Sequence, residues 1–73
     1  MGIEREKEKK IGIVIEALPN TLFRVELKDS KKVILGYLSG KMRLHRIRVL
    51  IGDTVEMEID PYNEDKAKIS KRM

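Results

Sequence analysis

The chain has no cysteine, a single histidine and only three aromatic side chains among its 73 residues. Without cysteine it can form neither disulfides nor thiolate metal sites, which fits a reducing compartment. The one histidine, His45, would have to serve as the base of any Ser-His-Asp triad, and no cysteine nucleophile is available. No stretch of about 20 apolar residues occurs, so no membrane-spanning helix is expected. These absences favour a binding protein over an enzyme, and we expect no catalytic residues, no cofactor and no metal site.

Positive charge is concentrated in a short segment near the middle of the chain. The net charge is +4, and residues 39–48 read Ser-Gly-Lys-Met-Arg-Leu-His-Arg-Ile-Arg, without a single acid. A solvated surface usually mixes both signs of charge, whereas cations alone suit phosphate backbones. An unbranched methionine among them can wedge against a base pair, although a core position is its alternative. The resulting candidates for contact with RNA are Lys41, Met42, Arg43, Arg46 and Arg48.

Alternation of apolar and polar residues predicts several short β-strands. The clearest runs are 23–28 and 54–60, with Val55, Met57 and Ile59 expected to face inward. Further strands are expected at 11–15, 32–38 and 66–70, with Gly36 marking a bulge or bend. Ser39 is a suitable cap for a short helix over residues 40–46. Residues 46–49 return to alternation before a turn at Gly52-Asp53.

Five strands with a helix after the third predict an all-β fold, a five-stranded Greek-key barrel of the OB type. An SH3-like barrel is the main competitor, because its strand count is similar. The expected domain spans residues 11–73. It follows a flexible charged tail over residues 1–10, which mixes three glutamates with four cations.

Two further charged groups are candidates for a site. Glu56 and Glu58 share one strand face, and a carboxylate pair can perform acid–base chemistry or hold a cation. A solvated acidic strand is the simpler interpretation. Cations return near the C-terminus at Lys66, Lys68, Lys71 and Arg72. With only Phe23, Tyr37 and Tyr62 available for base stacking, docking on folded RNA is favoured over binding of single strands.

Three blocks of the sequence together resemble the bacterial and plastid translation initiation factor one family. The first is Leu-Pro-Asn-Thr-Leu-Phe-Arg-Val-Glu-Leu at residues 18–27. The second joins Ser-Gly-Lys-Met-Arg at 39–43 to Ile-Arg-Val-Leu at 47–50 and Gly-Asp at 52–53. The third is Pro61-Tyr62 with the basic terminal strand, so that the resemblance covers residues 11–72.

The resemblance implies an OB fold that binds the small ribosomal subunit at the A site, in the decoding region. A factor of this kind occludes that site, so that initiator tRNA enters only the P site. Its implied partners are 16S-type rRNA, ribosomal proteins near the decoding site and the other two initiation factors. It is expected to be a monomer in the bacterial cytoplasm or the plastid stroma, without a membrane partner.

By the same resemblance, residues 41–43 belong in the RNA groove, and Arg46 and Arg48 contact the backbone. Lys66, Lys68 and Arg72 carry over as contacts of the terminal strand. Departures from the family pattern include Arg46 in place of an aromatic residue, and Ala67-Lys68 in place of Gly-Arg. Two alternatives stay open at this stage: a general single-stranded RNA chaperone of the cold-shock type, and a protein-interaction module that uses Glu56 and Glu58.

Overall fold

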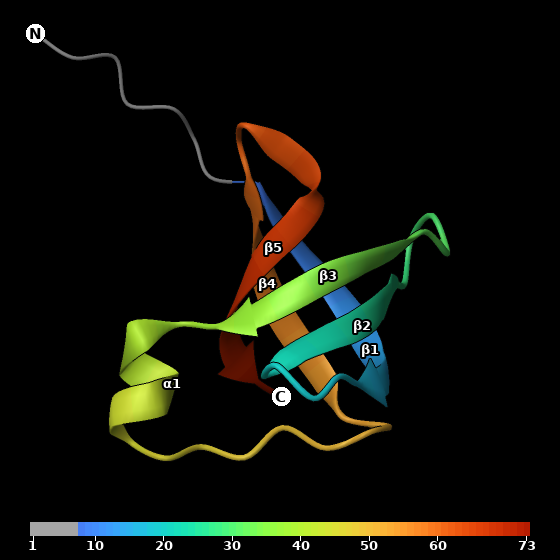
Figure 1. Cartoon of the computed structure of the whole chain (residues 1–73). Helices are drawn as coiled ribbons and strands as arrows, with labels where there is room; N and C mark the ends of the chain where they lie inside the picture. Colours follow the sequence, from blue (N-terminus) through green and yellow to red (C-terminus); the bar gives the residue numbers. More distant parts are fainter. Residues whose placement is uncertain (1–7) are drawn as a thin grey trace, which may run out of the picture.

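Five β-strands and one short helix make up the fold, as seen in a computed structural model that describes residues 8–73 (Figure 1). The helix lies between the third and fourth strands, as expected. In chain order the elements are β1 (Lys9–Ala17), β2 (Leu22–Leu27), β3 (Val33–Leu38), α1 (Gly40–Leu44), β4 (Thr54–Asp60) and β5 (Asn63–Arg72). No helix in this part of the chain is long and apolar enough to cross a membrane.

The strands close into a barrel with the order β1-β2-β3-β5-β4. β3 pairs with β5 in parallel, and the other four pairings are antiparallel. Closure leaves no unpaired edge, which removes the main liability of short strands. The register of β1 on β2 shifts between Val14 and Glu16, a bulge that helps a small barrel curve. The predicted five-stranded barrel with its helix after the third strand is confirmed.

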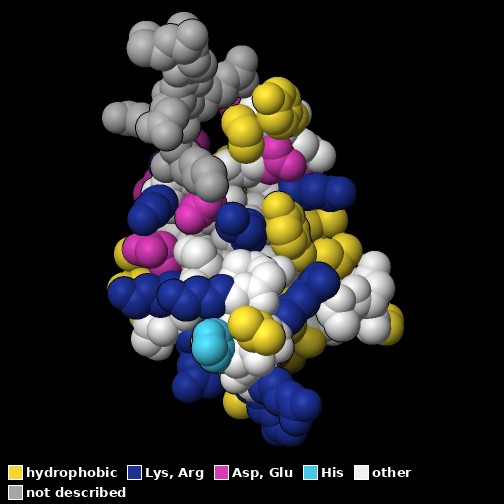
Figure 2. Space-filling view, turned by 90° about the vertical axis from the view of Figure 1, so that its left-hand side faces the viewer, with side chains coloured by type: hydrophobic (Ala, Val, Ile, Leu, Met, Phe, Trp, Pro, Cys, Tyr) yellow, Lys and Arg dark blue, Asp and Glu magenta, His cyan; other side chains and the backbone are white. Residues whose placement is uncertain are grey.

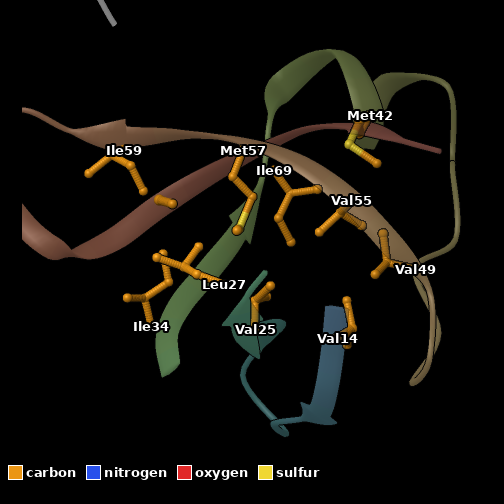
Figure 3. Close-up of a cluster of buried hydrophobic side chains, with 11 residues drawn as sticks. Val14, Val25, Leu27, Ile34, Met42, Val49, Val55, Met57, Ile59 and Ile69 are labelled. Carbon is orange, nitrogen blue, oxygen red and sulfur yellow. The ribbon is translucent and has the colours of Figure 1, made fainter. Parts of the chain in front are cut away.

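The core is formed by alternate residues of the strands, together with side chains from α1 and the loop after it (Figure 3). Val55, Met57 and Ile59 on β4 are all buried, as the alternation predicted, and so are Ala67 and Ile69 on β5. The remaining core residues are Val14, Val25, Leu27, Ile34, Met42 and Val49, with Phe23 and Leu38 packed against them. In a chain this small, a single such cluster supplies most of the burial that stabilises the fold.

Glycines permit close packing at two points of the barrel wall. A Cβ on Gly12 would lie 2.6 Å from Val25 Cγ1 and 2.8 Å from the Glu26 carbonyl oxygen, so only glycine fits there. At Gly36 a Cβ would lie 3.0 Å from the Ile69 side chain. The pairing of β3 runs through Gly36 without a register shift, so the bulge considered for this residue is not present. Close approach of neighbouring side chains explains the glycine instead.

Several element boundaries differ from the prediction; β5, for example, spans Asn63–Arg72, where a strand over 66–70 was expected. Residues 46–49 form no strand; they belong to an irregular segment that runs from the end of α1 to β4, and α1 ends at Leu44. Arg46 has a φ of 53° and the amide of Ile47 bonds back to the Met42 carbonyl, so the chain turns there instead of extending. Lys9 and Lys10 lie within β1 instead of the expected tail, of which residues 1–7 lie outside the described part.

Candidate nucleic-acid interface

The short helix α1 is held against the barrel by its first residues. Ser39 is the N-cap: its buried hydroxyl accepts a hydrogen bond from the Met42 amide at 3.2 Å. Its own amide donates to the Ile69 carbonyl on β5 at 3.0 Å, which fixes the start of the helix on the barrel. A serine cap satisfies an amide that would otherwise lack a partner, so the predicted helix start is confirmed.

Helical geometry separates the two cations of α1. Successive residues of an α-helix differ in direction by about 100°, so positions 41 and 43 flank the side that residue 42 presents. The Met42 side chain is 1 % exposed and belongs to the core. Lys41 and Arg43 are exposed on either side of it. Met42 thus lies at the core position that the sequence offered as its alternative, and Lys41 and Arg43 are the exposed cations of this helix.

The segment from 45 to 53 carries the next two cations and is held by backbone hydrogen bonds at both ends. At its start, the amides of His45 and Ile47 bond to carbonyls of α1. At its end, the Leu50 amide donates to Asp53 Oδ2 at 2.8 Å, and the Gly52 amide donates to the carbonyl of Val14 on β1. Gly52 has a φ of 96°, which confirms the predicted turn there. Arg46 and Arg48 are exposed between these anchors.

Two grooves flank α1, and each brings one cation of the helix together with one or two cations of β5. One groove of about 610 Å³ is lined by Lys41, Met42, Ile47, Ser70, Lys71 and Arg72. The other, of about 330 Å³, is lined by Leu22, Leu35, Tyr37, Arg43, Asp60 and Lys66. Lys41 and Arg43 are two residues apart in sequence, but they line different grooves. The structure brings most of the predicted candidates to one end of the barrel, but on two sides of one helix.

The terminal cations are not equivalent. The Lys68 amino group lies 3.6 Å from Glu58 Oε1, so a carboxylate already offsets its charge. Arg72 donates from Nη1 to the Arg48 carbonyl oxygen at 3.0 Å, which ties the end of β5 to the loop after α1. Lys66 and Lys71 are exposed and line the grooves described above. Lys68 is thus the least suited of the predicted terminal contacts to meet an external phosphate.

Ile47, Ser70 and Lys71 line the larger groove but are not among the predicted contacts. No signal in the sequence indicates that residue 47 folds back on α1, because that depends on the turn at Arg46. Lys71 could have been predicted as a contact, since it belongs to the terminal run of cations.

Charge is unevenly distributed over the surface. In the view of Figure 2, Lys and Arg side chains occupy the lower part, where no acidic side chain is visible, and acidic ones gather higher up. This lower part corresponds to the α1 end of the molecule in Figure 1. A surface of one sign attracts polyanions and orients the protein as it approaches them. We name the exposed cations around α1 the cationic face: Lys41, Arg43, Arg46, Arg48, Lys66, Lys71 and Arg72.

The acidic strand β4 is matched by lysines on both sides. Glu58 pairs in register with Lys9 of β1 and Lys68 of β5, and Glu56 pairs with Lys71 of β5. Opposite charges directly across a strand pair are favourable, so these acids fit a structural role in the barrel wall. Within residues 8–73, no group of three or more His, Cys, Asp or Glu side chains is arranged to hold a metal ion.

The shifted pKa values belong to a contact between β1 and the turn after β2, away from the cationic face. Lys10 Nζ donates to Asp29 Oδ2 at 2.8 Å. This hydrogen bond lowers the pKa of Asp29 and, with the charge of Asp29, raises the pKa of Lys10. Asp29 is exposed and Lys10 is half-buried, so the two form a surface ion pair that gives no indication of acid–base catalysis.

The few aromatic side chains do not form a stacking platform. Phe23 packs against the core and Tyr37 is half-buried beside Arg43 and Lys66 in the smaller groove. Tyr62 is 85 % exposed, but it lies in the β4–β5 turn, which is far from α1 in Figure 1. Proteins that bind single strands without sequence preference stack successive bases on several exposed rings. This surface offers charge and shape, with one half-buried ring.

Comparison with known proteins agrees with this geometry. The family model described as "Translation initiation factor 1A / IF-1" matches residues 2–73. A solution structure of the translation initiation factor one from the Wolbachia endosymbiont (strain TRS) of Brugia malayi is 38 % identical, with a TM-score of 0.76. The match covers 90 % of this chain and 77 % of that one. YjeQ from Thermotoga maritima is 27 % identical with a TM-score of 0.76, over 90 % of this chain but 23 % of that one. Matched along nearly its whole length, the chain belongs to the translation initiation factor 1A / IF-1 family.

Proposed function

We propose that this protein binds the small ribosomal subunit at the A site, in the decoding region, and occludes that site during initiation. The observation that carries this proposal is the cationic face, in which α1 and β5 present cations on two sides of one helix. Family membership supports a role in translation initiation. Occlusion directs initiator tRNA to the P site and requires no bond to be made or broken.

The mechanism rests on phosphate contacts from a preformed surface. Exposed Lys and Arg side chains replace counterions on the RNA, and arginine adds planar, forked hydrogen bonds. Lys41 and Arg43 project from opposite flanks of α1, so the helix can meet two backbone segments at once, as on the two sides of a groove. Met42 takes part indirectly, because its packing fixes the helix that carries both cations.

The proposed partners are 16S-type rRNA, the ribosomal proteins near the decoding site and the other two initiation factors. We place the protein in the cytoplasmic translation machinery, since the solved relative reported above comes from a bacterium. A monomer suffices for this role, because one barrel carries the whole cationic face. The two alternatives gain no support: the exposed aromatics are too few for a chaperone of single strands, and Glu58 of the acidic strand is paired with Lys68.

Measured affinity for small ribosomal subunits tests the proposal. We expect Lys41→Gln with Arg43→Gln to weaken binding at least tenfold, because two phosphate contacts are lost. The slope of log K against log salt should fall by roughly 1.5–2, close to 0.9 per contact. Glutamine has nearly the helix propensity of lysine and arginine, so α1 should persist.

The matched control removes two charges from the other end of the barrel. Lys28 and Lys31 are exposed beside the β2–β3 turn, which lies away from α1 in Figure 1. The pair Lys28→Gln with Lys31→Gln should leave both the affinity and the salt slope within error of the wild type. Equal losses from the two double variants would show attraction by net charge alone and would contradict the proposed site.

A further inference from the structure

We infer that Arg72 is a positioning residue: its guanidinium holds the backbone of the loop after α1, so that Arg48 is presented to RNA in a fixed direction. This inference rests on the proposed function. It assigns Arg72 a role beyond its charge in the cationic face, because its Nη1 atom donates to the Arg48 carbonyl oxygen at 3.0 Å.

The loop depends on this contact at one particular place. Its start is fixed by the Ile47 amide on the Met42 carbonyl, and its end by the Leu50 amide on Asp53. Between these anchors, the Arg72 guanidinium is the one hydrogen-bond partner of the backbone of residues 48 and 49 within the described part of the chain. The buried Val49 side chain fixes where the loop crosses the barrel end, and Arg72 fixes how the peptide of Arg48 is turned.

Arg72 itself is well anchored. It pairs in register with Val55 of β4, and the next amide, that of Met73, donates to the Thr54 carbonyl at 2.9 Å. The end of β5 is therefore part of the rigid barrel. From there the Arg72 side chain restrains the loop through its hydrogen bond to the Arg48 carbonyl oxygen. A loop ordered before binding loses less conformational freedom when it meets its partner, which increases affinity without a new contact.

Arg72→Leu in the full-length chain tests the inference. In the free protein, we expect backbone order parameters at residues 48 and 49 to fall from a rigid value near ~0.85 toward ~0.6. Binding to small ribosomal subunits should weaken about three- to tenfold, the range for the loss of one typical hydrogen bond. In an Arg48→Leu background the same change should weaken binding by a smaller factor than in the wild type, because the residue being positioned is already absent.

Lys71→Leu is the matched control, since Lys71 is the preceding residue, carries the same charge and lines the same groove. Lys71→Leu should leave the order parameters unchanged, and it should weaken binding by the same factor in the wild type and in the Arg48→Leu variant. Two results would overturn the positioning role while binding by the wild type persists. One is a loss of affinity on Arg72→Leu that is as large in the Arg48→Leu variant as in the wild type; the other is a set of order parameters that do not change. Failure of the wild type to bind would instead remove the proposed function, and with it any RNA role for Arg72.

Discussion

Met42→Ala should destabilise the free protein strongly, because this side chain is packed in the core. Met42 is 1 % exposed and among the largest fully buried side chains of the chain. Truncating a buried methionine to alanine costs about 2–5 kcal/mol through lost transfer free energy and the cavity left behind. A chain of this length has a total stability on the order of 4–11 kcal/mol, so the change removes a large share of it.

Urea unfolding of the free protein, followed by circular dichroism, measures this effect. Met42→Leu is the matched variant: it nearly conserves volume and should cost less than about 1.5 kcal/mol. Both variants should keep the wild-type m-value, since the surface exposed on unfolding hardly changes. A Met42→Ala protein that is as stable as the wild type, yet binds small ribosomal subunits poorly, would refute the burial argument and restore Met42 as a contact residue.

Three further predictions concern the barrel. Gly12→Ala should cost roughly 1–3 kcal/mol in urea unfolding, because the new methyl group meets Val25 and the Glu26 carbonyl; Gly40→Ala, with open space around its Cβ, should be neutral or stabilising. Ser39→Ala should cost about 1 kcal/mol by removing the cap of α1, and unchanged unfolding would contradict the capping role. An NMR titration should place the Asp29 carboxyl pKa below its ordinary 3.8, and Lys10→Met should raise it. Because the pKa of Asp29 is depressed on folding, its contact with Lys10 stabilises the protein above pH 3.8, and this stabilisation is lost as the pH falls through the lowered pKa. A pKa of 3.8 for Asp29 in the wild type would contradict this prediction.

Alternation predicted most of the barrel because each strand has one buried face. In a run such as 54–60 the apolar residues all fall on one face, and the structure buries that face. For β1 the pattern was ambiguous, since apolar residues occupy both faces. The structure turns Gly12 and Val14 inward and leaves Ile11 and Ile15 exposed, because only glycine fits where β1 approaches Val25 and Glu26.

The cationic face was predictable in composition but not in geometry. Local sequence shows that cations are concentrated at residues 41–48, but not that the core lies beneath residue 42. Residues 46–49 alternate as a strand does, but they form none. The chain turns back to α1 at Arg46, which has a positive φ, and the local sequence does not indicate this turn. The contact between Arg72 and Arg48 joins residues far apart in sequence, and no local pattern indicates such contacts.

The central claim is that the cationic face docks on the RNA of the decoding region, and chemical footprinting of small ribosomal subunits tests it most directly. Subunits would be probed alone, with the wild type, and with the Lys41→Gln, Arg43→Gln double variant. We predict that the wild type protects nucleotides of the decoding region only, and that the double variant loses this protection at the same concentration. Protection located elsewhere on the subunit, or protection at the decoding region that survives loss of both cations, would contradict the account.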